Sequence, residues 1–322
     1  MNSLKHQITT SMAMLPVSIA IAMVLWLWQA PLTLESGAGL VCVLILTFVL
    51  RWLSNTLQLI RVRSWAVSSI FVVLMAVCAP LHGWSVKVMG ITTLYMIHVG
   101  GLLLSTYVSR PQLSVFISSL ALGCLTMVLP QTVWLLPFSV MAMMMPLRIF
   151  SARVLAALFL GLLLPYEVWV AWHLVQGTLA EAFTNLMNGI IPSFSSLLAP
   201  KPSLLTPHSI LLIPILLFSL FGLVHFMRSS LDDKIATRMR YIVLLLHWPV
   251  LLVLVAIASQ ESRVESQELM SLAPAWLLCC SPLLARYFVF SRGWQAGLVF
   301  WLFFLALLAM SLYPLFLNLL IF

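Results

Sequence analysis

The sequence is poor in charge. Of its 322 residues only 7% are charged, with eight acidic residues against sixteen basic ones, whereas 63% are hydrophobic. An ordinary soluble domain carries about 25% charged residues, because its surface must face water. A water-soluble globular architecture is therefore excluded.

The sequence also lacks the motifs that carry catalysis or cofactors. It has no Walker A sequence, no Gly-rich dinucleotide turn, no His-Glu-x-x-His and no nucleophile elbow. Its five cysteines all fall inside apolar segments, without metal-ligand spacing. We expect no cofactor and no metal, and a non-enzymatic protein is favoured over an enzyme. The net positive charge does not indicate nucleic acid as a partner, because the basic residues stand mostly singly at the ends of apolar segments.

Long apolar segments dominate what is present. A membrane-spanning helix needs about 20 mainly apolar residues, and about 11 such segments fit into this chain. The predicted fold class is all-α, a polytopic transmembrane helical bundle that forms a single integral membrane domain over residues 1–322. The predicted spans are 12–30, 38–60, 65–82, 87–108, 112–129, 132–147, 154–175, 207–227, 241–259, 270–290 and 294–318.

The basic residues fall on alternate connections between these spans. Lysine and arginine in short loops stay in the cytoplasm, so their distribution predicts the orientation. The predicted cytoplasmic side holds Lys5, Arg61, Arg63, Arg110, Arg148, Arg153, Arg228, Lys234, Arg238, Arg240 and Arg292, with Arg51 and Arg286 inside spans towards the same side. The opposite side holds only Lys87, Lys201 and Arg263. The N-terminus is therefore predicted inside and the C-terminus outside.

Two connections are longer than a tight turn. Segment 176–206 begins with helical spacing and continues into several prolines, which predicts a short interfacial helix and an extended stretch on the outer face. Segment 228–240 is basic and predicts a cytoplasmic helical turn near anionic headgroups. The proline-rich fifth and sixth spans, 112–129 and 132–147, are either full crossings or a re-entrant hairpin.

A buried charge costs at least about 2.5 kcal/mol in hydrocarbon, so Glu167 needs a reason. It lies in the predicted span 154–175, about 12 Å from the outer end. Pro165 has no amide hydrogen, so the carbonyl of Gly161 lacks its intrahelical hydrogen bond close to Glu167. We expect Glu167 and Tyr166 to line a polar cavity that opens outward; the alternative is an interfacial Glu167 beside a simple bend.

Arg51, Asn55 and Gln58 recur at helical spacing in the predicted span 38–60. This spacing places the three on one helix face. If the span reaches Arg61, Arg51 is about 15 Å deep and must face protein or water. We expect a buried polar stripe, which extends the candidate cavity; alternatively, the span ends at Arg51.

Three further residues are weaker candidates. His98 lies mid-span before Gly100-Gly101, and His247 lies in His247-Trp248-Pro249, where a proton-relay role is conceivable as well as a packing role. Glu35 lies in the first outer loop and is a candidate acid.

Two stretches resemble a family of polytopic bacterial inner-membrane proteins that has no established activity. They are Arg153 at a helix start followed by Gly161-Leu-Leu-Leu-Pro165-Tyr166, and Ala273-Pro274 through Leu283-Leu284-Ala285-Arg286-Tyr287-Phe288. The resemblance implies a multi-pass protein of the bacterial inner membrane, and it carries no catalytic residues over.

Three functions fit these observations. The first is a non-enzymatic subunit or assembly factor of a cell-envelope complex, with other membrane-protein subunits and the lipid bilayer as partners. The second is a secondary transporter or flippase that uses a polar cavity near Glu167 and Arg51. The third is an enzyme that acts on a lipid-linked substrate at the outer face.

Overall fold

A computed structural model describes residues 7–9, 11–29, 33–60, 62, 64–83, 85–190, 207–260, 270–291 and 293–321. These residues form helices and no strand, which confirms the predicted all-α class. Eight of the described helices are long and apolar enough to cross a membrane: α3, α6, α7, α9, α12, α13, α15 and α16. This set is compatible with a multi-pass membrane protein. The predicted count of about 11 spans and the predicted orientation stay predictions.

The helices follow the predicted spans closely. Their bounds are α2 Met14–Gln29, α3 Leu34–Thr56, α4 Ala66–Val77, α5 Ala79–His82, α6 Val86–Leu104, α7 Pro111–Val128, η1 Pro130–Trp134, α8 Leu135–Met144, α9 Ala152–Gln176, α10 Leu179–Ile190, α12 Pro207–Ser229, η2 Ser230–Asp232, α13 Ile235–Gln260, α15 Ala273–Phe290 and α16 Trp294–Ile321. Three of the predicted spans correspond to helices shorter than a full crossing: α2, α4 and α8.

The helices form two compact units that interleave in the sequence. Unit 1 contains residues 1–89, 204–234 and 276–322, and unit 2 contains residues 90–203 and 235–275. Neither unit is a continuous stretch, so the chain passes between them several times. Two of the boundaries fall inside α6 and α15, and a third falls directly before α13.

In unit 1, α2 and α3 both pack on α4. Helix α3 starts at a capping box in which Thr33 and Ser36 bond each other's backbone, which fixes its first turn early in the apolar segment. Helix α12 crosses α15 closely, because a Cβ on Gly222 would lie 2.9 Å from the carbonyl oxygen of Leu283.

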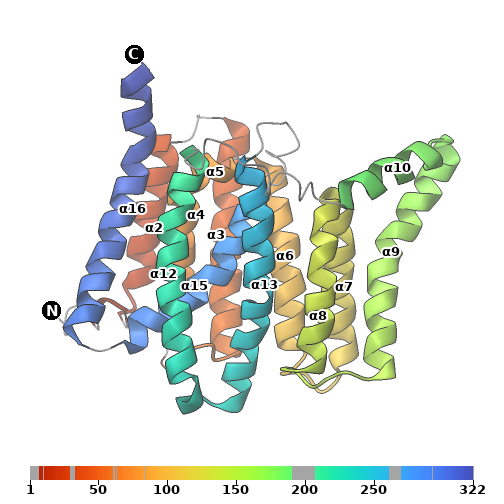
Figure 1. Cartoon of the computed structure of the whole chain (residues 1–322), viewed down its shortest axis with the longest axis horizontal. Helices are drawn as coiled ribbons and strands as arrows, with labels where there is room; N and C mark the ends of the chain where they lie inside the picture. Colours follow the sequence, from red (N-terminus) through yellow and green to blue (C-terminus); the bar gives the residue numbers. More distant parts are fainter. Residues whose placement is uncertain are drawn as a thin grey trace. The chain divides into compact units, whose positions relative to one another are not determined.

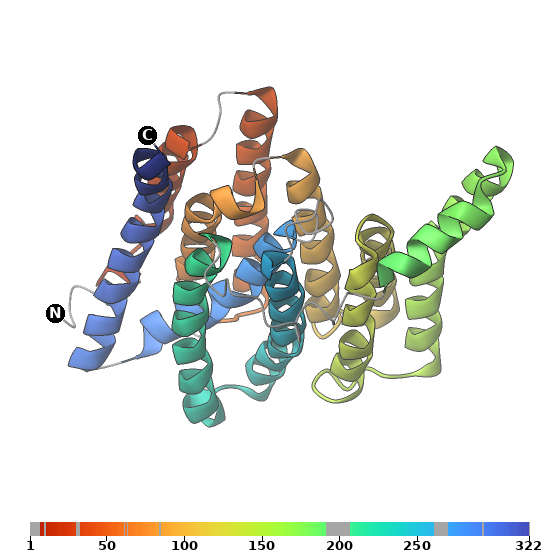
Figure 2. The ribbon, with the colours of Figure 1, turned by 45° about the horizontal axis from the view of Figure 1, so that its top comes forward.

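In unit 2, α7 packs chiefly on α9, and α8 packs on α13 (Figures 1 and 2). Two glycines allow the α7–α9 approach: a Cβ on Gly123 would lie 2.7 Å from the Leu162 carbonyl oxygen, and one on Gly161 would lie 2.1 Å from Ser119 Oγ. Helix α9 begins at Ser151, whose hydroxyl accepts from the Val154 amide, and ends at Gly177 in the left-handed conformation. Helix α10 then turns away from α9 (Figure 1).

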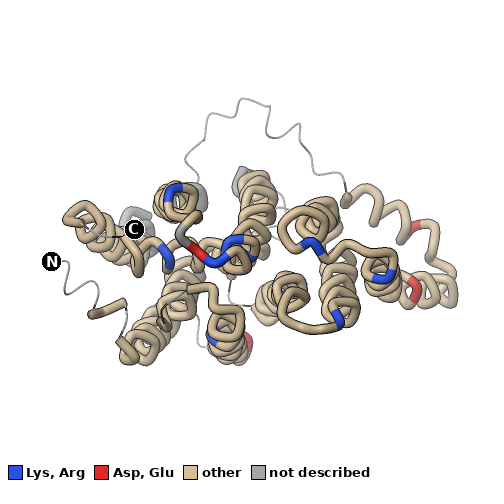
Figure 3. Tube along the Cα trace, turned by 90° about the horizontal axis from the view of Figure 1, so that it is seen from below, with Lys and Arg blue, Asp and Glu red and all other residues tan. Residues whose placement is uncertain are grey.

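Within each unit, many of the described basic positions gather at one end of the helices, as the view along the helices shows (Figure 3). In unit 2 they lie before α7, between α8 and α9, and in the first turns of α13, at Arg110, Arg148, Arg153, Arg238 and Arg240. This clustering agrees with the alternating charge pattern of the sequence. The predictions for residues 1–6, 61, 63, 191–206, 261–269 and 292 lie outside the described residues.

Candidate functional site

Four buried polar side chains meet inside unit 2, each from a different helix. His98 comes from α6, Ser118 from α7, Ser139 from α8 and His247 from α13, and none is more than 1% exposed. The Oγ of Ser139 lies 3.0 Å from His98 Nε2 and 3.1 Å from His247 Nε2, so one hydroxyl bridges the two imidazoles. The ring centroids of the two histidines are 5.6 Å apart.

The bonds of His247 define its tautomer. Its Nδ1 lies 2.9 Å from the carbonyl oxygen of Val243, and a carbonyl can only accept, so Nδ1 carries the hydrogen. In a neutral ring Nε2 is then an acceptor. It therefore needs the single hydrogen of Ser139, for which the carbonyl oxygen of Leu135 also competes at 2.9 Å.

The same argument applies to His98. Its Nδ1 lies 3.0 Å from the carbonyl oxygen of Ser118, while the Ser118 hydroxyl donates to the carbonyl oxygen of His98 at 2.7 Å. Nδ1 of His98 therefore donates, which leaves Nε2 of the neutral ring as a second acceptor facing Ser139.

The cluster is consequently short of one hydrogen when both rings are neutral. One added proton on His98 Nε2 lets His98 donate to Ser139 Oγ, while Ser139 donates to His247 Nε2. Moving the His98 proton to Ser139 as Ser139 passes its own hydrogen to His247 gives the mirror arrangement, with the charge on His247. The geometry thus suits one proton shared between two histidines.

The surroundings of the cluster are apolar and aromatic. Tyr95, fully buried, lies with its ring centroid 6.4 Å from each histidine ring. Within the described part of unit 2 the carboxylates are Glu167 and Glu181, and both are exposed. Among the described residues of unit 2, a proton on the cluster therefore has no buried carboxylate to offset its charge.

Proline or glycine stands close to the cluster in three of the four helices. Pro249 follows His247 inside α13 and removes one intrahelical hydrogen bond, whereas Pro137 lies in the first turn of α8, where proline is tolerated. Gly101 follows His98, and its missing Cβ lets α6 approach α7, since a Cβ there would lie 2.8 Å from the Cβ of Ser118. This approach brings Ser118 within reach of His98.

Glu167 and Tyr166 do not share a cavity. Glu167 is exposed, whereas the Tyr166 hydroxyl donates to Thr126 Oγ1 of α7 at 2.8 Å. Pro165 is buried, within 3.1 Å of the Cβ position of Gly123. Residues 161, 165 and 166 thus serve the α7–α9 contact, and successive helix residues point about 100° apart, which turns Glu167 away. The three pockets that the structure describes are lined by other residues.

The predicted buried stripe in α3 is wrong. The helix ends at Thr56, so Arg51 is only about 7.5 Å from its end, and Gln58 lies beyond it. Asn55 and Gln58 are exposed, and the half-exposed Arg51 stacks on Trp65 with its guanidinium carbon 3.7 Å from the ring centroid. The helix ends at Thr56 because Gln58 adopts the left-handed conformation, with φ at 48°, and the Leu59 amide donates to the Ser54 carbonyl oxygen at 3.1 Å. Glu35 is exposed in the first turn of α3, where a negative charge suits the helix dipole.

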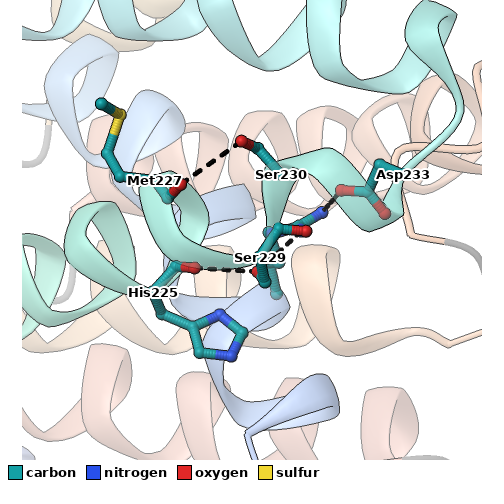
Figure 4. Close-up of polar contacts among 6 residues, drawn as sticks. His225, Met227, Ser229, Ser230 and Asp233 are labelled. Atoms are coloured by element: carbon teal, nitrogen blue, oxygen red, sulfur yellow. Dashed lines mark hydrogen bonds and ion pairs between the residues drawn. The ribbon is translucent and has the colours of Figure 1, made fainter.

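Sequence reasoning missed a buried ion pair in unit 1 (Figure 4). Arg286 of α15 pairs with Asp233, and the two side chains are 2% and 3% exposed. The guanidinium also donates to the hydroxyl and carbonyl oxygens of Ser229, at 3.0 and 3.3 Å. The signal was available: an arginine lies inside a predicted span, and an acidic pair lies in the neighbouring connection 228–240. In the structure this segment contains the end of α12, the short turn η2 at Ser230–Asp232 and the beginning of α13. The serines that complete the histidine cluster gave no signal, because serine is common in apolar helices.

No protein-family model, curated protein or solved structure matches this chain. Its function is therefore inferred from the chemistry of its own residues. The location in a bacterial inner membrane stays a prediction.

Proposed function

We propose that the protein is a proton-coupled secondary transporter and that His98, Ser139 and His247 bind the coupling proton. The observation that carries this proposal is the donor and acceptor count of the cluster, which is complete only with one added proton. Ionisable residues inside spanning helices are rare, and proton relays are one of their established uses.

The setting of the cluster supports the same function. Transport requires helices that rearrange around a binding site, and interrupted helices beside a midplane site are typical of secondary transporters. Pro249 interrupts the bonding of α13 two residues after His247. Because the described part of unit 2 holds no buried carboxylate, an anion is the solute class that would offset the charge of the protonated cluster.

The test uses purified protein in liposomes that contain a pH-sensitive dye, with a panel of small carboxylate and phosphate anions outside. We expect at least one anion to drive proton entry, and both His98→Gln and His247→Gln to abolish this entry. His173→Gln is the matched control, because His173 bonds Thr178 at the surface of unit 2. Absence of anion-driven proton entry in the unaltered protein, or its survival in the two cluster variants, would refute the proposal.

A second candidate function is a non-enzymatic subunit of a membrane complex. The exposed side of helix α9 supports it. Only 22% of the apolar stretch of α9 is buried, whereas 89% of the apolar stretch of α15 is buried. Glu167 stands on this exposed face, about 13 Å from the helix end at Gln176. A carboxylate there would be stabilised by a donor on a partner helix.

A photo-cross-linking residue tests the subunit function in the native membrane. Position 168 on α9 and position 305 on α16 are both 65% exposed and form a matched pair. A partner subunit predicts one discrete protein adduct from position 168, none from position 305, and loss of the adduct in Glu167→Lys. Lipid adducts alone at both positions would exclude the interface.

No described contact favours the enzyme hypothesis, since Glu35 and Glu167 are both exposed outside any described pocket.

A further inference from the structure

A groove of about 770 Å³ lies in unit 1 between α12 and α16, with Tyr287 of α15 among its lining residues. We call it the α12–α16 groove. Its α12 wall is a stripe at helical spacing that runs from Leu217 to Arg228, and its α16 wall runs from Gln295 to Val299. The stripe is about 16 Å long at the rise of an α-helix.

The polarity of the groove changes along its length. The part of α12 that lies deeper in the helix contributes Leu217, Phe221 and Val224, all apolar and more than 45% exposed. The part near the end of α12 contributes His225 and Arg228, and the beginning of α16 contributes Gln295. The groove is therefore apolar towards the middle of the helices and polar and basic where they end.

The two arginines near this end differ in their partners. Arg286 is held by Asp233 and Ser229, the two partners labelled in Figure 4, so the described acidic side chain of this region is already engaged. Arg228 is exposed and has no ion-pair partner in the described part of the chain. The polar end of the groove thus carries an exposed positive charge, which suits an anion.

We propose that the α12–α16 groove binds a phospholipid with an anionic headgroup. The phosphate lies at Arg228, and an acyl chain lies along Leu217, Phe221 and Val224. Charge complementarity selects the headgroup, since basic pockets between spanning helices bind anionic lipids. The apolar stretch selects a lipid over inorganic phosphate, which would leave that stretch uncovered.

Native mass spectrometry of the purified protein tests the proposal with phosphatidylglycerol and phosphatidylcholine of identical chains. We expect preferential retention of phosphatidylglycerol, and a loss of about fivefold in Arg228→Gln, the effect of one arginine at an anionic lipid surface. Val224→Trp, which fills the groove, should also reduce retention. The controls are Arg153→Gln, an exposed arginine of unit 2, and Ile213→Trp, an exposed position of α12 outside the groove.

Several results would overturn the proposal. They are equal retention of the two lipids, an equal loss in Arg153→Gln and Arg228→Gln, or displacement of phosphatidylglycerol by millimolar inorganic phosphate. If a variant does not fold, a photoreactive phosphatidylglycerol on the unaltered protein decides: label within 217–228, 287–291 or 295–299 supports the site, and label confined to other segments refutes it.

Discussion

At the scale of single residues, the buried polar groups are the most informative part of this molecule. The two histidines and Arg286 lie inside long apolar helices. Each is buried with partners from other helices, as the cost of an unpaired polar group in an apolar interior requires.

The ion pair of Arg286 and Asp233 gives a prediction at this scale. Arg286→Gln leaves Asp233 as an uncompensated buried charge, so we expect it to lower the free energy of unfolding by about 3–5 kcal/mol. The double variant Asp233→Asn with Arg286→Gln should recover part of this loss, because it removes both charges. Unfolding in mixed detergent micelles measures both, with Arg153→Gln as an exposed control. A loss in the single variant no larger than in the control would contradict a stabilising pair.

A smaller effect is expected at Tyr166. Its hydroxyl donates to Thr126, so Tyr166→Phe should cost about 1 kcal/mol of stability by the same measurement. Glu167→Gln should leave stability unchanged, since that carboxylate is exposed. Equal losses at the two neighbouring positions would contradict the orientation of α9.

At the scale of helices, small residues decide which pairs approach closely. The α7–α9 pair depends on Gly123 and Gly161, whose missing side chains leave room for backbone. Close approach through small residues is a main source of helix association in membranes, where no hydrophobic drive exists between helices.

Adding one methyl group tests this pair. Gly161→Ala would place a Cβ 2.1 Å from Ser119 Oγ and 2.5 Å from the Phe116 carbonyl oxygen, so the helices must separate. We expect a loss of about 1–3 kcal/mol in stability, the usual range for overpacking, and faster hydrogen exchange in α9. Gly90→Ala, with open space around it, is the control and should be neutral or stabilising. Similar behaviour of the two variants would show that α9 does not rely on this contact.

At the scale of the whole molecule, the predicted topology remains to be measured. The charge partition predicts a cytoplasmic N-terminus and an external C-terminus. In a bacterial inner membrane, a reporter active only in the periplasm should be active when fused after Phe322 and silent when fused near Lys234. The reverse activities would invert the orientation.

The sequence by itself determined the fold class and most helix positions. Apolar length and the cost of unpaired backbone in lipid leave a helix as the available solution for such segments. The sequence also indicated His98 and His247, because a histidine inside an apolar segment can be recognised from the sequence alone.

Only the tertiary structure decided which polar residues meet. His98 and Ser139 are 41 residues apart, and Ser139 and His247 are 108 apart, so their bridge depends on helix neighbours that no periodicity encodes. The α3 stripe failed for a related reason: helical spacing gives a common face, but the left-handed turn at Gln58 ends the helix, and only packing shows whether that face is covered. Glu167 and Tyr166, adjacent in sequence, point apart because a helix turns about 100° with each residue, and only packing shows which of them meets α7.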